Sequence, residues 1–172
     1  MGPIETLFLV LIAFFGVVGV VRTWPRELGV TTMLLLALFL LTFLFRTDAP
    51  GRLDSIFGRV GIAESQIVPL EGILAVLLLL AVAFISYQGM GLTYPGNAKS
   101  PGLSLAVGLI NGYLLIGSVW YYLARANWPL TTVLPNYTNF YDFFVKLLPP
   151  AIFPWQFFIL LAVAMLIVRV IK

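Results

Sequence analysis

Residues 4–45 read IETLFLVLIAFFGVVGVV-RTWPRE-LGVTTMLLLALFLLTFLF, two apolar stretches joined by a short charged turn. A membrane-spanning helix needs about 20 mainly apolar residues, because the hydrocarbon core is about 30 Å thick and a helix rises about 1.5 Å per residue. Each stretch is close to that length. Pro25 suits the first turn of a helix, where its missing N–H costs nothing. The segment therefore predicts a tight antiparallel hairpin of two membrane spans, at residues 4–21 and 28–45.

The rest of the chain continues this pattern. Of its 172 residues, 61% are hydrophobic and only 10% are charged, and the mean hydropathy is +1.04. A soluble domain of this size cannot bury so much apolar surface in one core, whereas lipid tails solvate it readily. Three more stretches are long enough to span, at residues 70–87, 103–124 and 155–171. We therefore expect one domain over residues 1–172, an all-α polytopic membrane protein with about five transmembrane helices.

Two connections between these spans repeat an apolar residue at i, i+3, i+4 and i+7. The members are Leu53, Ile56, Phe57 and Val60 in the first connection, and Tyr137, Phe140, Tyr141 and Phe144 in the second. This spacing predicts two short amphipathic helices, which beside a membrane lie in the interface, where aromatic side chains prefer the headgroup level. The connection 89–101 is rich in Gly and Pro and predicts a plain loop.

The composition also removes whole classes of chemistry. The chain has no cysteine, so it forms no disulfide, and no histidine, the commonest metal ligand and general base. Asp48, Asp54 and Glu64 are scattered without metal-ligand spacing. We therefore expect a non-enzymatic protein with no catalytic residue, no metal site and no cofactor. The net charge of +3 is spread along the chain, which favours a bilayer with anionic lipid as the partner over nucleic acid.

Small residues mark one face of the fourth predicted helix. Ser104, Gly108 and Gly112 recur every four residues, a pattern that lets two helix backbones approach closely. Asn111 lies beside them and is expected to hydrogen-bond across the seam. The pattern predicts a helix-packing interface. The alternative is a polar site on a solute path, which requires convergent partners for Asn111.

Charged residues cluster at the border of the predicted hairpin. Arg22, Arg26 and Glu27 form the densest cluster, which we interpret as a solvated turn that fixes topology. The alternative is a docking point for a cytoplasmic partner. Glu5 and Glu71 each fall in the first turn of a predicted helix, where a carboxylate complements the helix dipole.

Orientation does not follow directly from charge. With five spans, each face of the membrane collects five basic residues, so the positive-inside rule gives a tie. Basic residues are concentrated in the short hairpin turn and at the C-terminus, and we give these two places more weight. Both the turn and the C-terminus are then expected to lie in the cytoplasm. This weighting predicts an outside N-terminus and a cytoplasmic C-terminus.

Three segments together are similar to a known family. Residues 19–28, GVVRTWPREL, are similar to a Gly-x-x-Arg-Gly-x-x-Arg-Glu turn between the first two helices. Residues 105–112, LAVGLING, are similar to a Gly-rich helix with small residues every four. Residues 128–149 are similar to a long external segment with a Trp, a Leu-Pro, aromatic positions and a second Leu-Pro. On these segments the chain resembles the colicin V production (CvpA-like) family of bacterial inner-membrane proteins.

The resemblance covers residues 4 to about 150, with three departures. Thr23 stands where the family has Gly, Asn111 stands where members often have Arg, and a fifth apolar stretch follows. The resemblance implies an outside N-terminus, a cytoplasmic hairpin, and a role in toxin export or envelope upkeep. It implies no catalytic residue.

Three hypotheses on function follow. The first is a non-enzymatic inner-membrane protein of this family, active in export, envelope maintenance or scaffolding through contacts with other membrane subunits or with itself. The second is an accessory subunit of a respiratory or photosynthetic complex. The third is a small transporter or channel, in which Asn111 would line the path.

Overall fold

The computed structural model is helical in every element that it describes. Its long helices are α1 (Pro3–Arg22), α2 (Trp24–Leu44), α4 (Glu64–Tyr87) and α5 (Pro101–Arg125), followed by α6 (Asn139–Lys146), α7 (Pro149–Ile152) and α8 (Trp155–Ile171). The structure describes residues 3–45, 57, 59–88, 92–96, 100–128 and 139–171. The predicted all-α fold class is confirmed.

Four helices are long and apolar enough to cross a membrane: α1, α2, α4 and α5. The fifth predicted span, α8, is an apolar helix of 17 residues. At about 1.5 Å per residue it falls slightly short of the 30 Å hydrocarbon core. The prediction of a polytopic membrane protein is confirmed, with four full-length spans and a shorter fifth helix.

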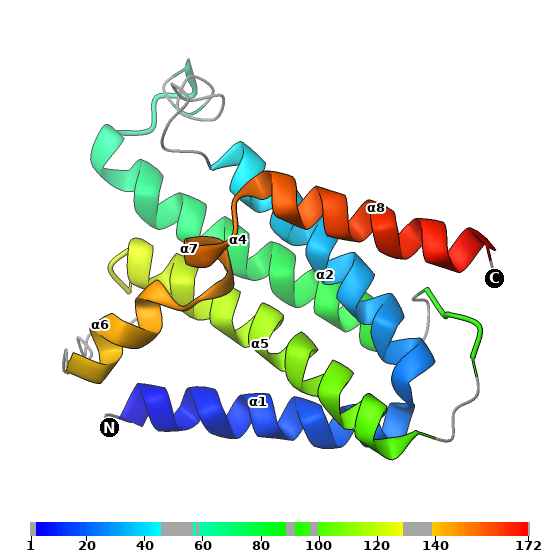
Figure 1. Cartoon of the computed structure of the whole chain (residues 1–172). Coiled ribbons are helices and arrows are strands. Elements are labelled where there is room, and N and C mark those ends of the chain that lie inside the picture. The colour runs from blue at the N-terminus through cyan, green and yellow to red at the C-terminus, as the bar shows by residue number, and fades with distance from the viewer. Residues whose placement is uncertain are drawn as a thin grey trace.

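Helix α5 occupies the centre of the bundle (Figure 1). On one side it packs against α1, and on the other against α2 and α4, while α8 lies on the far side of α2. We call the end where α1 turns into α2 the hairpin end. There α4 and α8 end and α5 begins, whereas α6 and α7 lie at the opposite end with the N-terminus.

Apolar side chains fill the centre of the bundle between α2, α4, α5 and α8. The buried members of this core include Leu34, Leu35, Leu38, Leu41, Leu79, Leu115, Phe158 and Ala162. The outer faces of α1, α4 and α8 expose large apolar side chains instead, Val170 to 84%. Such faces suit lipid, which solvates apolar side chains as well as a protein core does.

Helix α4 begins earlier than the sequence predicts. It starts at Glu64 instead of residue 70, and Pro69 lies inside it. Pro69 is the sixth residue of α4, so it removes one intrahelical hydrogen bond close to the helix start. Glu71 is therefore not in the first turn, and its interpretation as a partner of the helix dipole is wrong.

Helix α6 confirms the second predicted amphipathic helix over Asn139–Lys146. Its aromatic face packs inward: Tyr141 is buried against Trp120, and Phe144 contacts Phe8. Phe140 stays 54% exposed. Tyr137 lies outside the described residues.

The first predicted amphipathic helix falls mostly outside the described residues, which exclude Leu53 and Ile56. Phe57 is helical, and Val60 is exposed in a turn.

Candidate functional site

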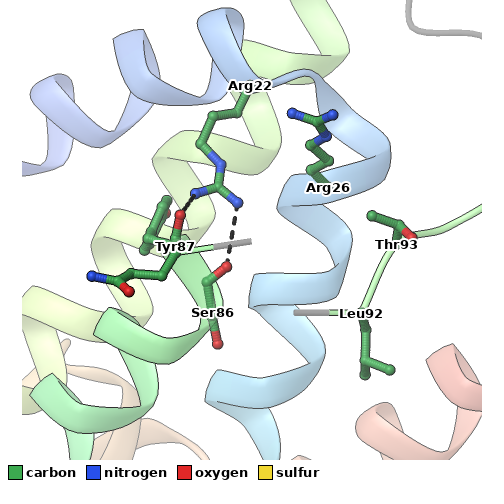
Figure 2. A pocket seen from close by; sticks show the side chains of 7 residues that line it. Arg22, Arg26, Ser86, Tyr87, Leu92 and Thr93 are labelled. Carbon is green, nitrogen blue, oxygen red and sulfur yellow. Dashed lines mark hydrogen bonds between the residues drawn. The ribbon is translucent and has the colours of Figure 1, made fainter. Parts of the chain in front are cut away.

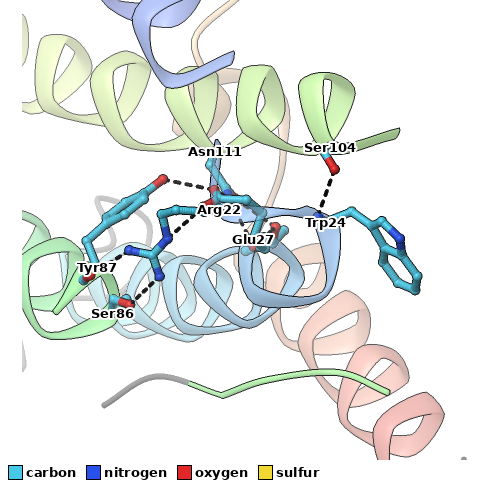
Figure 3. A network of polar contacts seen from close by, with 8 residues as sticks. Arg22, Trp24, Glu27, Ser86, Tyr87, Ser104 and Asn111 are labelled. Atoms are coloured by element: carbon cyan, nitrogen blue, oxygen red, sulfur yellow. Dashed lines mark hydrogen bonds and ion pairs between the residues drawn. The ribbon is translucent and has the colours of Figure 1, made fainter. Parts of the chain in front are cut away.

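A fully buried carboxylate lies at the hairpin end, where four helices meet (Figure 3). Glu27, in the first turn of α2, is 0% exposed. Its Oε1 lies 3.2 Å from Arg22 Nε at the end of α1. Its Oε2 accepts hydrogen bonds from Asn111 Nδ2 of α5 at 2.8 Å and from the Tyr87 hydroxyl of α4 at 3.1 Å. The carboxylate therefore links α1, α2, α4 and α5.

Asn111 is saturated by this network. Its Nδ2 also donates to the Glu27 carbonyl at 3.0 Å, and its Oδ1 accepts from the Thr31 hydroxyl at 2.7 Å. An amide offers two donors and one acceptor oxygen, and each of these groups has a partner here. Asn111 thus has the convergent partners that a polar site requires.

Arg22 also closes the C-terminal end of α4. Its two terminal nitrogens donate to the carbonyls of Ser86 and Tyr87, and its guanidinium carbon lies 4.5 Å from the centre of the Tyr87 ring. The last carbonyls of a helix lack intrahelical partners and favour a nearby cation. Arg22 therefore donates hydrogen bonds to the last carbonyls of α4 and also neutralises the Glu27 carboxylate.

The predicted cluster of Arg22, Arg26 and Glu27 is split by the structure. Arg26 is exposed, as a solvated turn requires. Glu27 is fully buried and the Arg22 side chain is only 20% exposed, so the interpretation of a solvated turn is wrong for these two residues. The reason is that α4 and α5 close over the turn, which the spacing along α1 and α2 does not show.

The small residues of α5 lie against the backbone of α1. A Cβ added at Gly108 would lie 2.4 Å from the Phe15 carbonyl oxygen, and one at Gly112 would lie 2.9 Å from the Phe15 Cβ. The Ser104 hydroxyl accepts a hydrogen bond from the Trp24 N–H at 2.9 Å, at the first residue of α2.

Asn111 does not bond across this seam. It precedes Gly112 by one residue, which turns its side chain by about 100° around the helix. It therefore faces α2, where Glu27 and Thr31 lie, and the expected bond across the small-residue face is replaced by bonds to α2.

An open pocket lies beside the network (Figure 2). It has a volume of about 540 Å³ and is lined by Arg22, Arg26, Ser86, Tyr87, Gln88, Leu92 and Thr93. Arg22 reaches it from the end of α1 and Arg26 from the first turn of α2. Within the described part of the chain, Arg26 has no ion-pair partner.

The segment 92–96 supplies Leu92 and Thr93 to the lining of this pocket and is anchored to α2. Tyr94 is 6% exposed, its N–H donates to the Pro25 carbonyl at 3.0 Å, and its hydroxyl lies 2.9 Å from the Thr32 hydroxyl. Gly29 permits this contact, because a Cβ there would lie 1.6 Å from the Leu92 carbonyl oxygen. Residues 92–96 form a loop, as predicted, and this loop packs into the bundle.

A second ion pair lies at the opposite end. Arg125 Nη2, at the end of α5, lies 3.3 Å from Glu71 Oε2, and Arg125 Nη1 donates to the Phe45 carbonyl just after α2 at 3.0 Å. A pocket of about 380 Å³ adjoins Arg125, with Tyr122 and Trp155 in its lining. Glu71 is thus paired with a guanidinium.

Sequence reasoning did not single out Tyr87, Thr31 or Arg125. One signal was available in the sequence. Tyr87 is the last residue of α4 and Arg125 is the last residue of α5, and a polar side chain at such a position can reach the end of a neighbouring helix. Among the described residues, no group of three or more acidic residues could hold a metal ion.

No family model, no curated protein and no solved structure matches this chain.

Proposed function

We propose that this chain is a non-enzymatic membrane protein that acts as a rigid platform for other membrane components, in export, envelope maintenance or scaffolding. One observation carries the proposal. Arg22, Glu27, Glu71 and Arg125 are all used in bonds between helices of the same bundle. Charges near the ends of the spans thereby hold the helices together, as a platform requires. The resemblance to the colicin V production family points to the same class of role.

The platform proposal is tested by isolation from membranes in mild detergent after cross-linking in intact cells. We expect either a self-associated form or the same membrane protein partner in repeated preparations. A monomer without partners would contradict the proposal. Co-migration with a pigmented or haem-bearing complex on a native gel would instead identify the chain as an accessory subunit of that complex.

A second candidate, a small transporter or channel, is favoured by the convergence of Glu27, Tyr87 and Asn111 next to an open pocket. The buried leucines between α2, α4 and α5 lie beyond this network and oppose a continuous path. Flux through liposomes that falls in the Asn111→Leu variant would support transport. Unchanged flux, or none, would end this candidate.

We further propose the bacterial inner membrane as the location, with the hairpin end in the cytoplasm. Among the described residues, this end holds Arg22, Arg26 and Arg169 against the single acid Glu27. Because the chain has no cysteine, single cysteines at Thr93 and Lys146 allow a direct test. We expect an impermeant maleimide to label Lys146→Cys in intact cells, and Thr93→Cys only after permeabilisation. The reverse pattern would invert the proposed topology.

A further inference from the structure

The hairpin end carries more positive charge than its own acid can neutralise. Glu27 pairs with Arg22 at 3.2 Å, which leaves the charge of Arg26 without an ion-pair partner among the described residues. Arg169 lies at the same end and donates from Nε to the Thr93 carbonyl at 3.2 Å. This carbonyl belongs to a residue that lines the pocket.

The opposite end does not share this excess. Its described basic residues are matched by at least as many acids. The basic residues are Arg59, Arg125 and Lys146, and the acidic residues are Glu5, Glu71 and Asp142. Among the described residues, the positive charge without a matching acid therefore lies at the hairpin end.

The pocket also offers unused hydrogen-bond donors. A guanidinium has five N–H groups, and those of Arg26 bond to no residue in the described ranges. Each terminal nitrogen of Arg22 carries a second N–H besides the one that bonds to a carbonyl of α4. Guanidinium groups match the oxygens of a phosphate in geometry and charge. We propose that this pocket binds a phosphate group.

The position of the pocket indicates where that phosphate comes from. Arg22 and Tyr87 are the last residues of two membrane spans, so the pocket opens at the depth of the lipid headgroups. Its volume of about 540 Å³ lies in the range of small-ligand sites, roughly 300–1,000 Å³. The headgroup of an anionic phospholipid fits this depth and this charge, and a soluble phosphate shares the same chemistry.

The site is held in place before any ligand arrives. Arg22 is held by two carbonyls of α4 and by Glu27. The segment 92–96 is anchored through Tyr94, which bonds to Pro25 and lies against Thr32. A site with fixed side chains loses little conformational entropy when a ligand binds. Only Arg26, which is exposed, has to become ordered.

The test is a lipid titration of the full-length protein in detergent, with the bound lipid counted by native mass spectrometry. Phosphatidylglycerol is the probe, diacylglycerol with the same acyl chains lacks the phosphate, and inorganic phosphate is the soluble competitor. We expect retention of phosphatidylglycerol and none of diacylglycerol. Competition by inorganic phosphate would assign the site to soluble phosphates as well, whereas no competition would assign it to the lipid.

Two variants that each remove one positive charge test whether the lipid binds at this pocket. Arg26→Gln removes the unpaired guanidinium, and a charge-assisted hydrogen bond of typical strength corresponds to an affinity loss of about tenfold or more. Arg59→Gln removes an exposed arginine at the opposite end and should leave the affinity unchanged. Equal retention by Arg26→Gln and the unchanged protein would overturn the proposal, as would equal retention of diacylglycerol. Because Arg26 is exposed and unpaired within the described residues, its replacement should leave the fold intact, which circular dichroism checks.

Discussion

The two ends of the bundle are built on the same plan. At the hairpin end, Arg22 is the last residue of α1, donates to the carbonyls that end α4, and pairs with Glu27 of α2. At the opposite end, Arg125 is the last residue of α5, donates to the Phe45 carbonyl just after α2, and pairs with Glu71 of α4. In both cases one arginine closes a helix end and joins two further helices.

The ends differ in how deeply this pair is buried. The Glu27 side chain is 0% exposed and the Glu71 side chain 9%, while their arginines are 20% and 26% exposed. The hairpin end adds Asn111 and the Tyr87 hydroxyl around its carboxylate. A charge at the end of a span can therefore act as a clamp that joins helices, and a clamp that is shielded from water needs more hydrogen bonds.

The largest expected effect is the loss of the deeper carboxylate. Glu27→Ala leaves Arg22, Tyr87 and Asn111 without their shared partner, and breaking a buried ion pair typically costs about 3–5 kcal/mol. Glu71→Ala is the matched change at the opposite end and should cost less, because water reaches that pair. The measurement is the free energy of unfolding in mixed detergent micelles. Equal losses would show that the two clamps are equivalent.

The next effect concerns the amide that only the hairpin end has. Asn111→Leu leaves Glu27 Oε2 with one fewer donor and the Thr31 hydroxyl without its acceptor on α5. An unsatisfied buried polar group costs about 1–3 kcal/mol, so the free energy of unfolding should fall by about 2 kcal/mol. In a double-mutant cycle with Glu27→Ala, the two losses should not add, because both variants remove the same bond. Additive losses would mean that the amide and the carboxylate act independently.

The packing of the loop 92–96 beside the pocket at the hairpin end depends on Gly29. Gly29→Ala places a Cβ against the Leu92 carbonyl, and forced overpacking costs about 1–3 kcal/mol. Gly102→Ala is the control, since its Cβ would meet nothing within 4 Å and alanine favours a helix over glycine by up to about 1 kcal/mol. In detergent, the unfolding temperature should fall in Gly29→Ala and should rise slightly in Gly102→Ala. A neutral Gly29→Ala would show that residues 92–96 are not packed on α2.

The smallest effect is a gain in stability. Thr23 joins α1 to α2 with a φ of 73°, a conformation that is unfavourable for a β-branched residue. Glycine adopts it without strain. Thr23→Gly should therefore raise the free energy of unfolding by about 1 kcal/mol, because the relieved strain exceeds the entropy that glycine loses.

The matched control is Asn127→Gly at the opposite end, where φ is 54°. Asparagine tolerates this region better than threonine, so the gain should be smaller. A loss of stability in Thr23→Gly would show that the side chain of Thr23 has a stabilising contact of its own.

Prediction from the sequence succeeded for features that depend on one helix alone, such as where an apolar helix begins and ends. The spans predicted at 4–21, 103–124 and 155–171 agree with α1, α5 and α8 to within two residues at each end. The sequence did not show contacts that depend on a second segment. Tyr94 sits in a stretch rich in Gly and Pro, yet it is buried because Gly29 leaves room on α2, a fact that lies far away in the sequence.

The order of apolar and helix-breaking residues is enough to predict an all-α membrane protein and roughly where its helices begin and end. These are local properties, and each sufficiently long apolar helix is stable in a bilayer without reference to the others. Which charged residues pair follows from how the helices pack. Arg22 and Glu27 are only five residues apart along the chain, but their burial depends on α4 and α5, which supply Tyr87 and Asn111. Burial and pairing are properties of the packed bundle, because each side chain is shielded from water by helices that are distant in sequence.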